Sequence, residues 1–400
     1  MPHRMTTSPR VLIIQAEMKH YRIPFFEGLY AALQRDGIEL TVLYSNSNPI
    51  QELRKDSADL ASPVGRRVGG RWFFNRFLYQ SVWKEVFASD LVIVGSEVKF
   101  LINPALILMS KLGLKTVAFW GLGPNRHPDR FPFIEWVKQH FFTCADWYFA
   151  YTDSIAEYIK RKGMPARKVT NVQNATDTEE LKSLIAKISQ DDAVRAKESH
   201  TGSRETRIGL YCGVLAGIKA LPLLLSAARL VKAKCPEFHL VLIGDGPDRS
   251  WLQSAIAHDP WIHYLGFKNH EEGALYYKMA DVFLLAGTVG LAVVDSFAAG
   301  LPLIATRLTT HPPEISYVID GYNGHLALHE ADALANSIID VLSNPALMER
   351  LRQGAVESGR KYTMEAMVDN FRLGVKQCLD YYGSSVSPQI AKPLTTRSDS

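Results

Sequence analysis

The chain has 400 residues, of which 47% are hydrophobic and 22% are charged, so it can bury large cores and is not expected to be disordered throughout. This length is enough for two domains. The formal net charge is only +4, which is too weak to indicate nucleic-acid binding. It is compatible with anionic membrane surfaces or phosphate-bearing substrates.

The four cysteines are scattered and show neither metal-ligand spacing nor a disulfide framework, which indicates reduced thiols in a cytosolic protein. The N-terminal segment leads into a predicted strand without the apolar region of a signal peptide. No run of about 18 apolar residues is present, so the sequence predicts no membrane-spanning helix.

The first half of the chain alternates short apolar strands with helices. Residues 11–14 form a predicted strand, a helix begins near Pro24, and a second strand covers residues 38–44. This strand–helix–strand order predicts a parallel sheet with right-handed crossovers. Four further predicted strands continue the pattern at residues 91–94, 115–120, 147–151 and 169–172.

Residues 52–85 interrupt this alternation with closely spaced basic and aromatic residues. From Arg71 to Phe87 the spacing fits an amphipathic helix, and this composition suits an anionic membrane interface. The alternative is that the aromatic rings pack into the domain and the arginines are solvated. We expect peripheral membrane association through the segment from Arg66 to Trp83.

Residues 178–206 are polar and charged, and we expect an interdomain linker there. A second alternating region begins at Arg207, with a strand at residues 208–212 and a loop that contains Gly213 and Lys219. A later strand ends in a Gly-x-Gly-Pro turn that starts at Gly244. This turn lacks the third glycine of a dinucleotide fingerprint, which argues against NAD binding.

Residues 280–302 read as a buried strand, a glycine-containing loop and a helix. Gly287 and Gly290 bracket the loop, where the backbone can approach a ligand closely. A loop that feeds the free N–H groups of a helix is a candidate anion site. The same pattern also fits an ordinary strand–turn–helix unit. Near the C-terminus, residues 364–382 carry the apolar stripe of a helix.

The stretch of residues 280–302 resembles the donor-site signature of retaining glycosyltransferases with the two-domain GT-B architecture, known as glycosyltransferase family 4 or group 1. In that family the loop and helix read Glu, seven residues, Glu, and then a Gly-x-Pro turn. Gly287 and Asp295 stand at the two Glu positions, while Gly290, Gly300 and Pro302 are kept. Near the N-terminus, the segment YRIPFFEGL resembles the opening of bacterial polysaccharide-type members.

The resemblance covers roughly residues 10–380. It implies an α/β GT-B fold with two Rossmann-like parallel-sheet domains, a cleft between them and a C-terminal helix that crosses back. The expected parts are an acceptor-binding domain at 1–180, a linker at 181–206, a nucleotide-sugar-binding domain at 207–363, a crossover helix at 364–383 and a disordered tail at 384–400.

The family's first loop of the second domain carries an Arg and a Lys that stabilise charge on the leaving diphosphate. Lys219 matches the Lys, and Val214 occupies the Arg position. A His-Gly pair in the first domain aligns with Leu122, with His127 close behind. The resemblance therefore implies catalytic roles for Lys219, Glu314 and His127. It implies donor contacts from Gly213, Lys219, Gly244, Phe267, Gly290, Leu291 and Asp295.

The implied activity is metal-independent transfer of a hexose, with retention, from a nucleotide-sugar donor to a saccharide or lipid-linked acceptor in cell-surface polysaccharide biosynthesis. No cofactor or nucleic-acid partner is expected. The absence of a DxD-type metal triplet in a suitable loop agrees with a metal-independent reaction, and no Ser-His-Asp or zinc-type constellation indicates a hydrolase. The expected location is the cytoplasm, with peripheral attachment to the inner face of the plasma membrane.

Two alternatives remain open from the sequence. Changes at Leu122, Val214, Gly287 and Asp295 favour a catalytically weakened homologue that binds a nucleotide or a partner protein. A GT-B sugar epimerase or phosphorylase would need a base near the sugar or a lysine-bound cofactor, and neither is evident.

Overall fold

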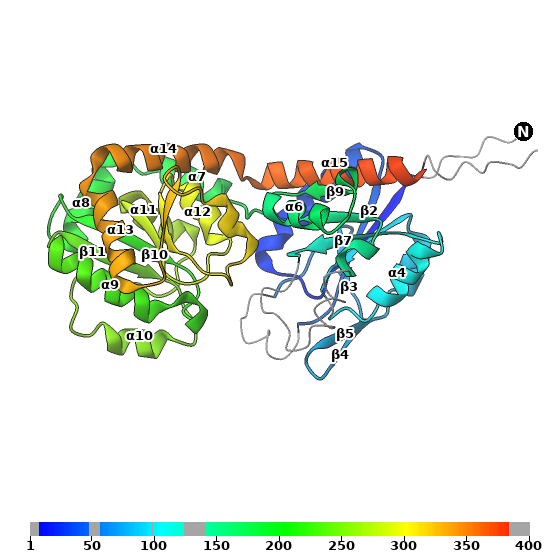
Figure 1. Cartoon of the computed structure of the whole chain (residues 1–400), viewed down its shortest axis with the longest axis horizontal. Helices are drawn as coiled ribbons and strands as arrows, with labels where there is room; N and C mark the ends of the chain where they lie inside the picture. Colours follow the sequence, from blue (N-terminus) through cyan, green and yellow to red (C-terminus); the bar gives the residue numbers. More distant parts are fainter. Residues whose placement is uncertain (1–7, 48–56, 98, 124–140, 384–400) are drawn as a thin grey trace, which may run out of the picture.

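The computed structural model describes residues 8–47, 57–97, 99–123 and 141–383. These residues form two α/β domains that lie side by side, with one long helix reaching from the second domain over the first (Figure 1). Each domain is built on an entirely parallel central sheet. The predicted GT-B type of α/β architecture is therefore confirmed.

The first domain holds a seven-stranded sheet in the order β3-β2-β1-β6-β7-β8-β9. Its five inner strands are short runs, mostly of Val, Ile, Leu and aromatic residues, that are largely buried on both faces, as parallel sheets covered by helices require. Their bounds are Arg10–Ile14 (β1), Glu39–Tyr44 (β2), Gly65–Arg67 (β3), Leu91–Gly95 (β6), Thr116–Gly121 (β7), Trp147–Ala150 (β8) and Val169–Asn171 (β9).

Helices connect these strands, and most match the predicted alternation. Pro24 lies in the first turn of α1, where a missing N–H costs nothing. The helical segments are His20–Arg22 (η1), Ile23–Arg35 (α1), Trp83–Ala88 (α3), Asn103–Lys111 (α4), Phe142–Cys144 (η2), Asp153–Arg161 (α6) and Ala166–Lys168 (η3), where η marks a 3₁₀ turn.

The prediction of an amphipathic helix from Arg71 to Phe87 is wrong. Residues Gly70–Phe73 (β4) and Phe77–Gln80 (β5) instead form an antiparallel hairpin, and only the short helix α3 follows it. Phe74 and Asn75 adopt positive φ angles of 52° and 51° at the hairpin turn. Aromatic residues favour strands over helices, and that preference outweighed the helical spacing.

The second domain holds a six-stranded sheet in the order β12-β11-β10-β13-β14-β15. Its strand order reverses beside β10, at the type of switch point where open α/β sheets bind ligands. The strands are Arg207–Cys212 (β10), Phe238–Ile243 (β11), Ile262–Tyr264 (β12), Val282–Leu285 (β13), Leu303–Thr306 (β14) and Gly324–Ala327 (β15).

The segment expected as a linker, residues 181–206, is mostly helical, and its helices pack against α11 of the second domain. The helical segments of this half are Glu179–Lys187 (α7), Gln190–Thr201 (α8), Gly217–Lys219 (η4), Leu221–Lys234 (α9), Arg249–Ala255 (α10), His270–Met279 (α11), Ala292–Ala298 (α12), Pro313–Tyr317 (η5), Ala331–Ser343 (α13), Pro345–Lys361 (α14) and Met364–Gly383 (α15).

Helix α15 crosses to the first domain, as predicted (Figure 1). Phe371 on this helix stacks on Phe149 of β8, with ring centroids 4.3 Å apart, and also meets Trp120 edge-on. At the surface, Arg372 and Lys376 both form ion pairs with Asp36 at the end of α1. An apolar contact at the centre and charges at the margin therefore hold α15 to the first domain.

Within the described residues, none of the helices is both long enough and apolar enough to span a bilayer. The tail expected at residues 384–400 lies outside the described residues, and so does His127.

The contact at Phe371 yields a stability prediction. Replacing Phe371 with Ala removes a fully buried ring from between α15 and the first domain, which should cost about 3–5 kcal/mol of unfolding free energy. The matched control is Leu373→Ala on the same helix, whose side chain is exposed and whose loss should change stability by less than about 0.5 kcal/mol. Urea denaturation measures both, and equal effects would contradict the role assigned to α15.

Candidate functional site

The carboxyl edges of the two sheets face each other, and side chains from both domains meet there. Tyr317 of η5 donates its hydroxyl to the carbonyl oxygens of Tyr151, directly after β8, and of Asn174. The Tyr317 ring also stacks on Tyr362, at the junction between α14 and α15, with centroids 3.9 Å apart. The loops that follow the strands of both domains are therefore gathered along one boundary.

Two loops of the second domain interlock at this boundary. The loop after β13 donates the backbone N–H of Thr288 to the carbonyl oxygen of Ile218, which lies in the loop after β10. Gly287 is packed so closely that a Cβ atom there would overlap the backbone of Ile218 and Lys219. Glycine therefore occupies this position because the backbone of the neighbouring loop fills the space that a side chain would need.

The same interlock holds the side chain of Lys219. Its Nζ donates to the carbonyl oxygen of Thr288 at 2.6 Å, and only 9% of the residue's surface is exposed. Burial lowers the pKa of the Lys219 ammonium to about 8. An ammonium has three donors, so those not used by Thr288 can serve an anion. An anion bound here would favour the protonated form of the lysine.

The backbone amides that follow Thr288 are the second element of this site. Among the residues that the structure describes, the N–H groups of Gly290 and Leu291 donate no hydrogen bond. A Cβ atom at Gly290 would meet nothing within 4 Å, so the backbone is open to approach on that side. Helix α12 has only seven residues, so these open amides, and not the helix as a whole, form the candidate anion site.

His311 positions this loop, and the sequence analysis gave it no functional role. Its Nδ1 accepts the backbone N–H of Val289 at 3.0 Å, while its Nε2 lies 2.7 Å from the carbonyl oxygen of Thr306. These contacts fit a neutral ring with its proton on Nε2. The signal in the sequence is a histidine immediately before two prolines and Glu314.

Asp295 lies on α12 at the domain boundary. Its carboxylate accepts a hydrogen bond from the hydroxyl of Thr176 at 3.4 Å. Burial raises the pKa of this carboxyl, while positive charge at His270 and the Thr176 hydrogen bond act in the opposite direction. Asp295, which stands where the resembling family has Glu, therefore lies beside Thr176 in the segment that joins the domains.

Glu314 and Lys219 contact different groups, and no hydrogen bond or ion pair among the described residues joins them. It is only 3% exposed, and its carboxylate accepts a hydrogen bond of 2.5 Å from the side-chain amide of Asn174. Arg22, which follows β1 in the first domain, is buried against Trp120 and lies within electrostatic reach of Glu314. These contacts place Glu314 between the domains and make it a group that fixes their relative position.

The remaining expected residues lie along the carboxyl edge of the second sheet. Gly213 follows β10, and a Cβ atom at Gly244 would overlap its backbone. The N–H of Gly244 donates to the carbonyl oxygen of Gly266, which precedes the exposed ring of Phe267. Gly244 therefore allows two loops to pack together, while Phe267 offers an open aromatic face.

The substituted positions Leu122 and Val214 are both exposed, and they lie in loops at the carboxyl edges of the first and second sheets. His127 cannot be placed, because it falls outside the described residues. Within the residues that are described, no group of three His, Cys, Asp or Glu side chains could hold a metal ion.

Residues 177–358 match the protein family described as glycosyl transferases group 1. The alpha-monoglucosyldiacylglycerol synthase of Acholeplasma laidlawii is 34% identical over 136 residues, which are 32% of this chain and 33% of that protein. EpsD of Bacillus subtilis, named as a glycosyltransferase, is 27% identical over 261 residues, or 60% of this chain and 65% of EpsD. The chain thus matches between a third and two thirds of the length of these relatives.

The fold is similar to that of the Anabaena protein HepE, whose crystal structure holds UDP. The two superpose with a TM-score of 0.65 over 92% of this chain and 99% of HepE, at 14% sequence identity. At this identity the likeness establishes the architecture of both domains.

The interlocked loops yield a second prediction. Restoring an acid with Gly287→Glu should destabilise the protein by about 1–3 kcal/mol, because the new side chain must displace the backbone of Ile218 and Lys219. Gly290→Ala, in the same loop but facing open space, should stay within about 0.5 kcal/mol of the parent protein. Thermal or urea unfolding distinguishes them, and a stable Gly287→Glu variant would refute the close packing described here.

Proposed function

Residues 177–358 of this chain belong to the glycosyl transferases group 1 family, and from this premise we propose that the protein transfers a hexose from a nucleotide-sugar donor to a saccharide or lipid-linked acceptor. The observation that carries the proposal is the pairing of the buried Lys219 ammonium with the open amides of Gly290 and Leu291. Cleavage of the donor leaves negative charge on its diphosphate, and these groups offer positive charge and N–H donors to it.

The proposed reaction proceeds with retention and without a metal ion. The bond between the sugar and the diphosphate breaks, and the acceptor oxygen bonds to the same face of the sugar while its proton passes to the leaving phosphate. Lys219 stabilises the leaving group, and Asp295 is placed to accept hydrogen bonds from the donor's ribose. In this proposal the donor sugar lies toward the first domain, on the side of Arg22.

The names of the relatives support the two acceptor classes. One matched relative is named as a synthase of a glucosylated diacylglycerol, which favours a lipid-linked acceptor for this chain. The UDP in the HepE crystal structure supports a uridine-linked donor as the first candidate to test. Cell-surface polysaccharide biosynthesis in the cytoplasm, at the inner face of the plasma membrane, is the setting that we propose.

A second candidate function is nucleotide or partner binding without efficient transfer. It is favoured by Gly287, which offers no side chain to the donor sugar, and by Val214, which replaces a cation of the resembling family. Glu314 cannot substitute freely for the missing acid while Asn174 holds it between the domains.

Turnover of a donor panel tests the proposal. UDP-, GDP- and ADP-linked hexoses are incubated with the full chain, and release of the nucleoside diphosphate is measured. We expect one donor to be hydrolysed slowly without acceptor, and Lys219→Gln to reduce this rate about 100-fold or more, since one lost electrostatic donor has that effect in comparable sites. Gln is shorter than Lys by one methylene group but keeps a neutral N–H donor in the buried site, and its melting temperature checks that the variant is folded.

Lys234→Gln, at an exposed lysine on α9, is the matched control and should leave the rate unchanged. Nucleotide binding without turnover of any donor would contradict transfer and favour the second candidate. If the protein neither binds a nucleotide nor turns over any donor, both candidate functions are contradicted.

The hairpin of β4 and β5 supports peripheral membrane attachment. The Phe74 ring at its tip is 94% exposed, and Phe73 and Tyr79 beside it are also exposed. Arg71 and Arg76 lie on the same hairpin, and within the described residues no carboxylate is within ion-pair distance of either. Exposed rings among cations fit the interface of an anionic bilayer.

Backbone hydrogen bonds connect the hairpin of β4 and β5 to the segment before α4. The β5 residue Leu78 exchanges backbone hydrogen bonds with Lys99 and Leu101, and α4 then presents the exposed side chain of Leu108. The helix expected from Arg71 to Phe87 is absent, and the hairpin of β4 and β5 exposes basic and aromatic residues of this segment instead.

Vesicle binding tests the membrane proposal. Phe74→Asn should weaken binding to phosphatidylglycerol vesicles about tenfold at low salt, because burial of one Phe contributes about 1.5–3 kcal/mol. Asn tolerates a positive φ, so the turn is kept. Leu373→Asn, at an exposed apolar site on α15, is the control and should bind normally. If the parent protein sediments without vesicles, or if both variants behave alike, the hairpin does not anchor the protein.

A further inference from the structure

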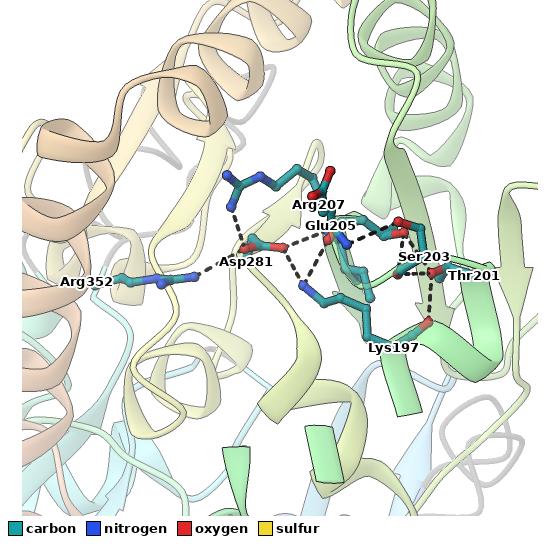
Figure 2. Close-up of polar contacts among 9 residues, drawn as sticks. Lys197, Thr201, Ser203, Glu205, Arg207, Asp281 and Arg352 are labelled. Carbon is teal, nitrogen blue, oxygen red and sulfur yellow. Dashed lines mark hydrogen bonds and ion pairs between the residues drawn. The ribbon is translucent and has the colours of Figure 1, made fainter. Parts of the chain in front are cut away.

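A group of cations surrounds one carboxylate at the amino edge of the second sheet, opposite the donor site. Asp281 directly precedes β13, and Arg207 is the first residue of the neighbouring strand β10. Figure 2 shows Lys197 from α8, Arg207 and Arg352 from α14 pointing toward the Asp281 carboxylate from three sides. None of these residues takes part in the site described above.

The contacts at Asp281 differ in quality. One carboxylate oxygen accepts the backbone N–H of Ile208 at 2.9 Å and lies 3.2 Å from Lys197 Nζ. The other oxygen has only longer contacts of 3.4 Å, with Arg207 and Arg352. Lys197 and the amide thus satisfy this buried carboxylate, since one well-placed cation is enough to compensate one buried negative charge. The two arginines are in excess of that requirement.

A cavity of about 350 Å³ opens beside this group. Four cationic side chains line it, namely Lys197, Arg204, Lys278 and Arg352, whereas Asp281 is the single acidic residue of its lining. Lys197 and Arg352 share the Asp281 carboxylate, and Arg204 pairs with Glu198. Lys278 is half-buried, and none of the ion pairs among the described residues involves it. Four cations against these two carboxylates leave a net positive charge beside the cavity.

Aliphatic side chains also line the cavity. They come from Met279, Ala280 and Leu301, together with Ile185 of α7 and Val194 of α8. A cavity lined by both cations and aliphatic side chains suits a small ligand that has a charged end and a carbon skeleton. Guanidinium groups in particular match the oxygens of a phosphate.

We propose that this cavity binds a small phosphate ester, with the phosphate between Arg352 and Lys278 and the carbon skeleton against Met279 and Leu301. The turn of Ala299 to Leu301 that floors the cavity ends helix α12, and the other end of α12 follows Gly290. The ligand thus contacts the far end of an element that borders the donor site.

Isothermal titration with two probes tests the proposal on the full chain at constant ionic strength. Inorganic phosphate should bind, and glucose 6-phosphate should bind more tightly, because only the ester has a carbon skeleton that can contact the aliphatic side chains of the lining. Lys278→Gln should weaken binding of the ester about tenfold, as expected for the loss of one charge-assisted contact. Arg204→Gln, whose described partner is the exposed Glu198, is a second cavity variant and should also weaken it.

Lys234→Gln, which does not line the cavity, is the control and should bind the ester like the parent protein. Melting temperatures confirm that all three variants fold. The proposal is overturned if the ester does not bind, if it binds no more tightly than phosphate, or if Lys278→Gln and Arg204→Gln bind it as well as the control does.

Discussion

The close approach of the loops after β10 and β13 is the constraint on which the candidate site depends. Gly287 lies against the backbone of Ile218 and Lys219, and the Lys219 ammonium closes the contact on the Thr288 carbonyl. This contact buries the ammonium and lowers its pKa, and it presents the amides that follow Thr288 on the same side. His311 accepts a hydrogen bond from the backbone N–H of Val289, which lies between Thr288 and Gly290. A bulkier residue at Gly287 would separate all of these groups.

A second layer of contacts sets the distance between this site and the first domain. Asn174 and Tyr151, at the end of the first domain, hold Glu314 and Tyr317 of η5. Helix α15 continues from the stack of Tyr317 on Tyr362 and carries Phe371 into the first domain. A change in domain orientation must therefore break buried hydrogen bonds, so these contacts hold the two domains in a defined orientation.

Much of the fold could be predicted from the sequence because the signals were local. Short runs such as Val282–Leu285 have strand length and composition, and Pro24 or Gly300 mark the ends of helices. The hairpin at Phe74 was mispredicted because basic and aromatic residues there satisfy two periodicities at once. Pairing of Arg71 with Tyr79 and of Trp72 with Leu78 decided between them, and pairing is not visible in one segment.

The site was less predictable because its contacts join segments far apart in the chain. Lys219 and Gly290 were expected, but the reason for Gly287 was not, since it depends on the backbone of residues almost 70 positions earlier. Glu314 was expected to be catalytic from the family resemblance, yet its partner Asn174 is 140 positions away. Asp281 drew no attention, because its three cations come from three different elements.

The pH dependence of UDP binding tests the central claim most directly. The terminal phosphate of UDP is already largely dianionic above pH 7, so changes at higher pH report on the protein. Because the pKa of Lys219 is lowered to about 8, the free protein loses the ammonium as the pH rises through that value. The account predicts that affinity falls between pH 7.5 and pH 9.5, by up to about tenfold per unit above pH 8, and that Lys219→Gln binds weakly with no such dependence. An affinity that is constant over this range in the parent protein, or a Lys219→Gln variant that follows the same curve, would contradict it.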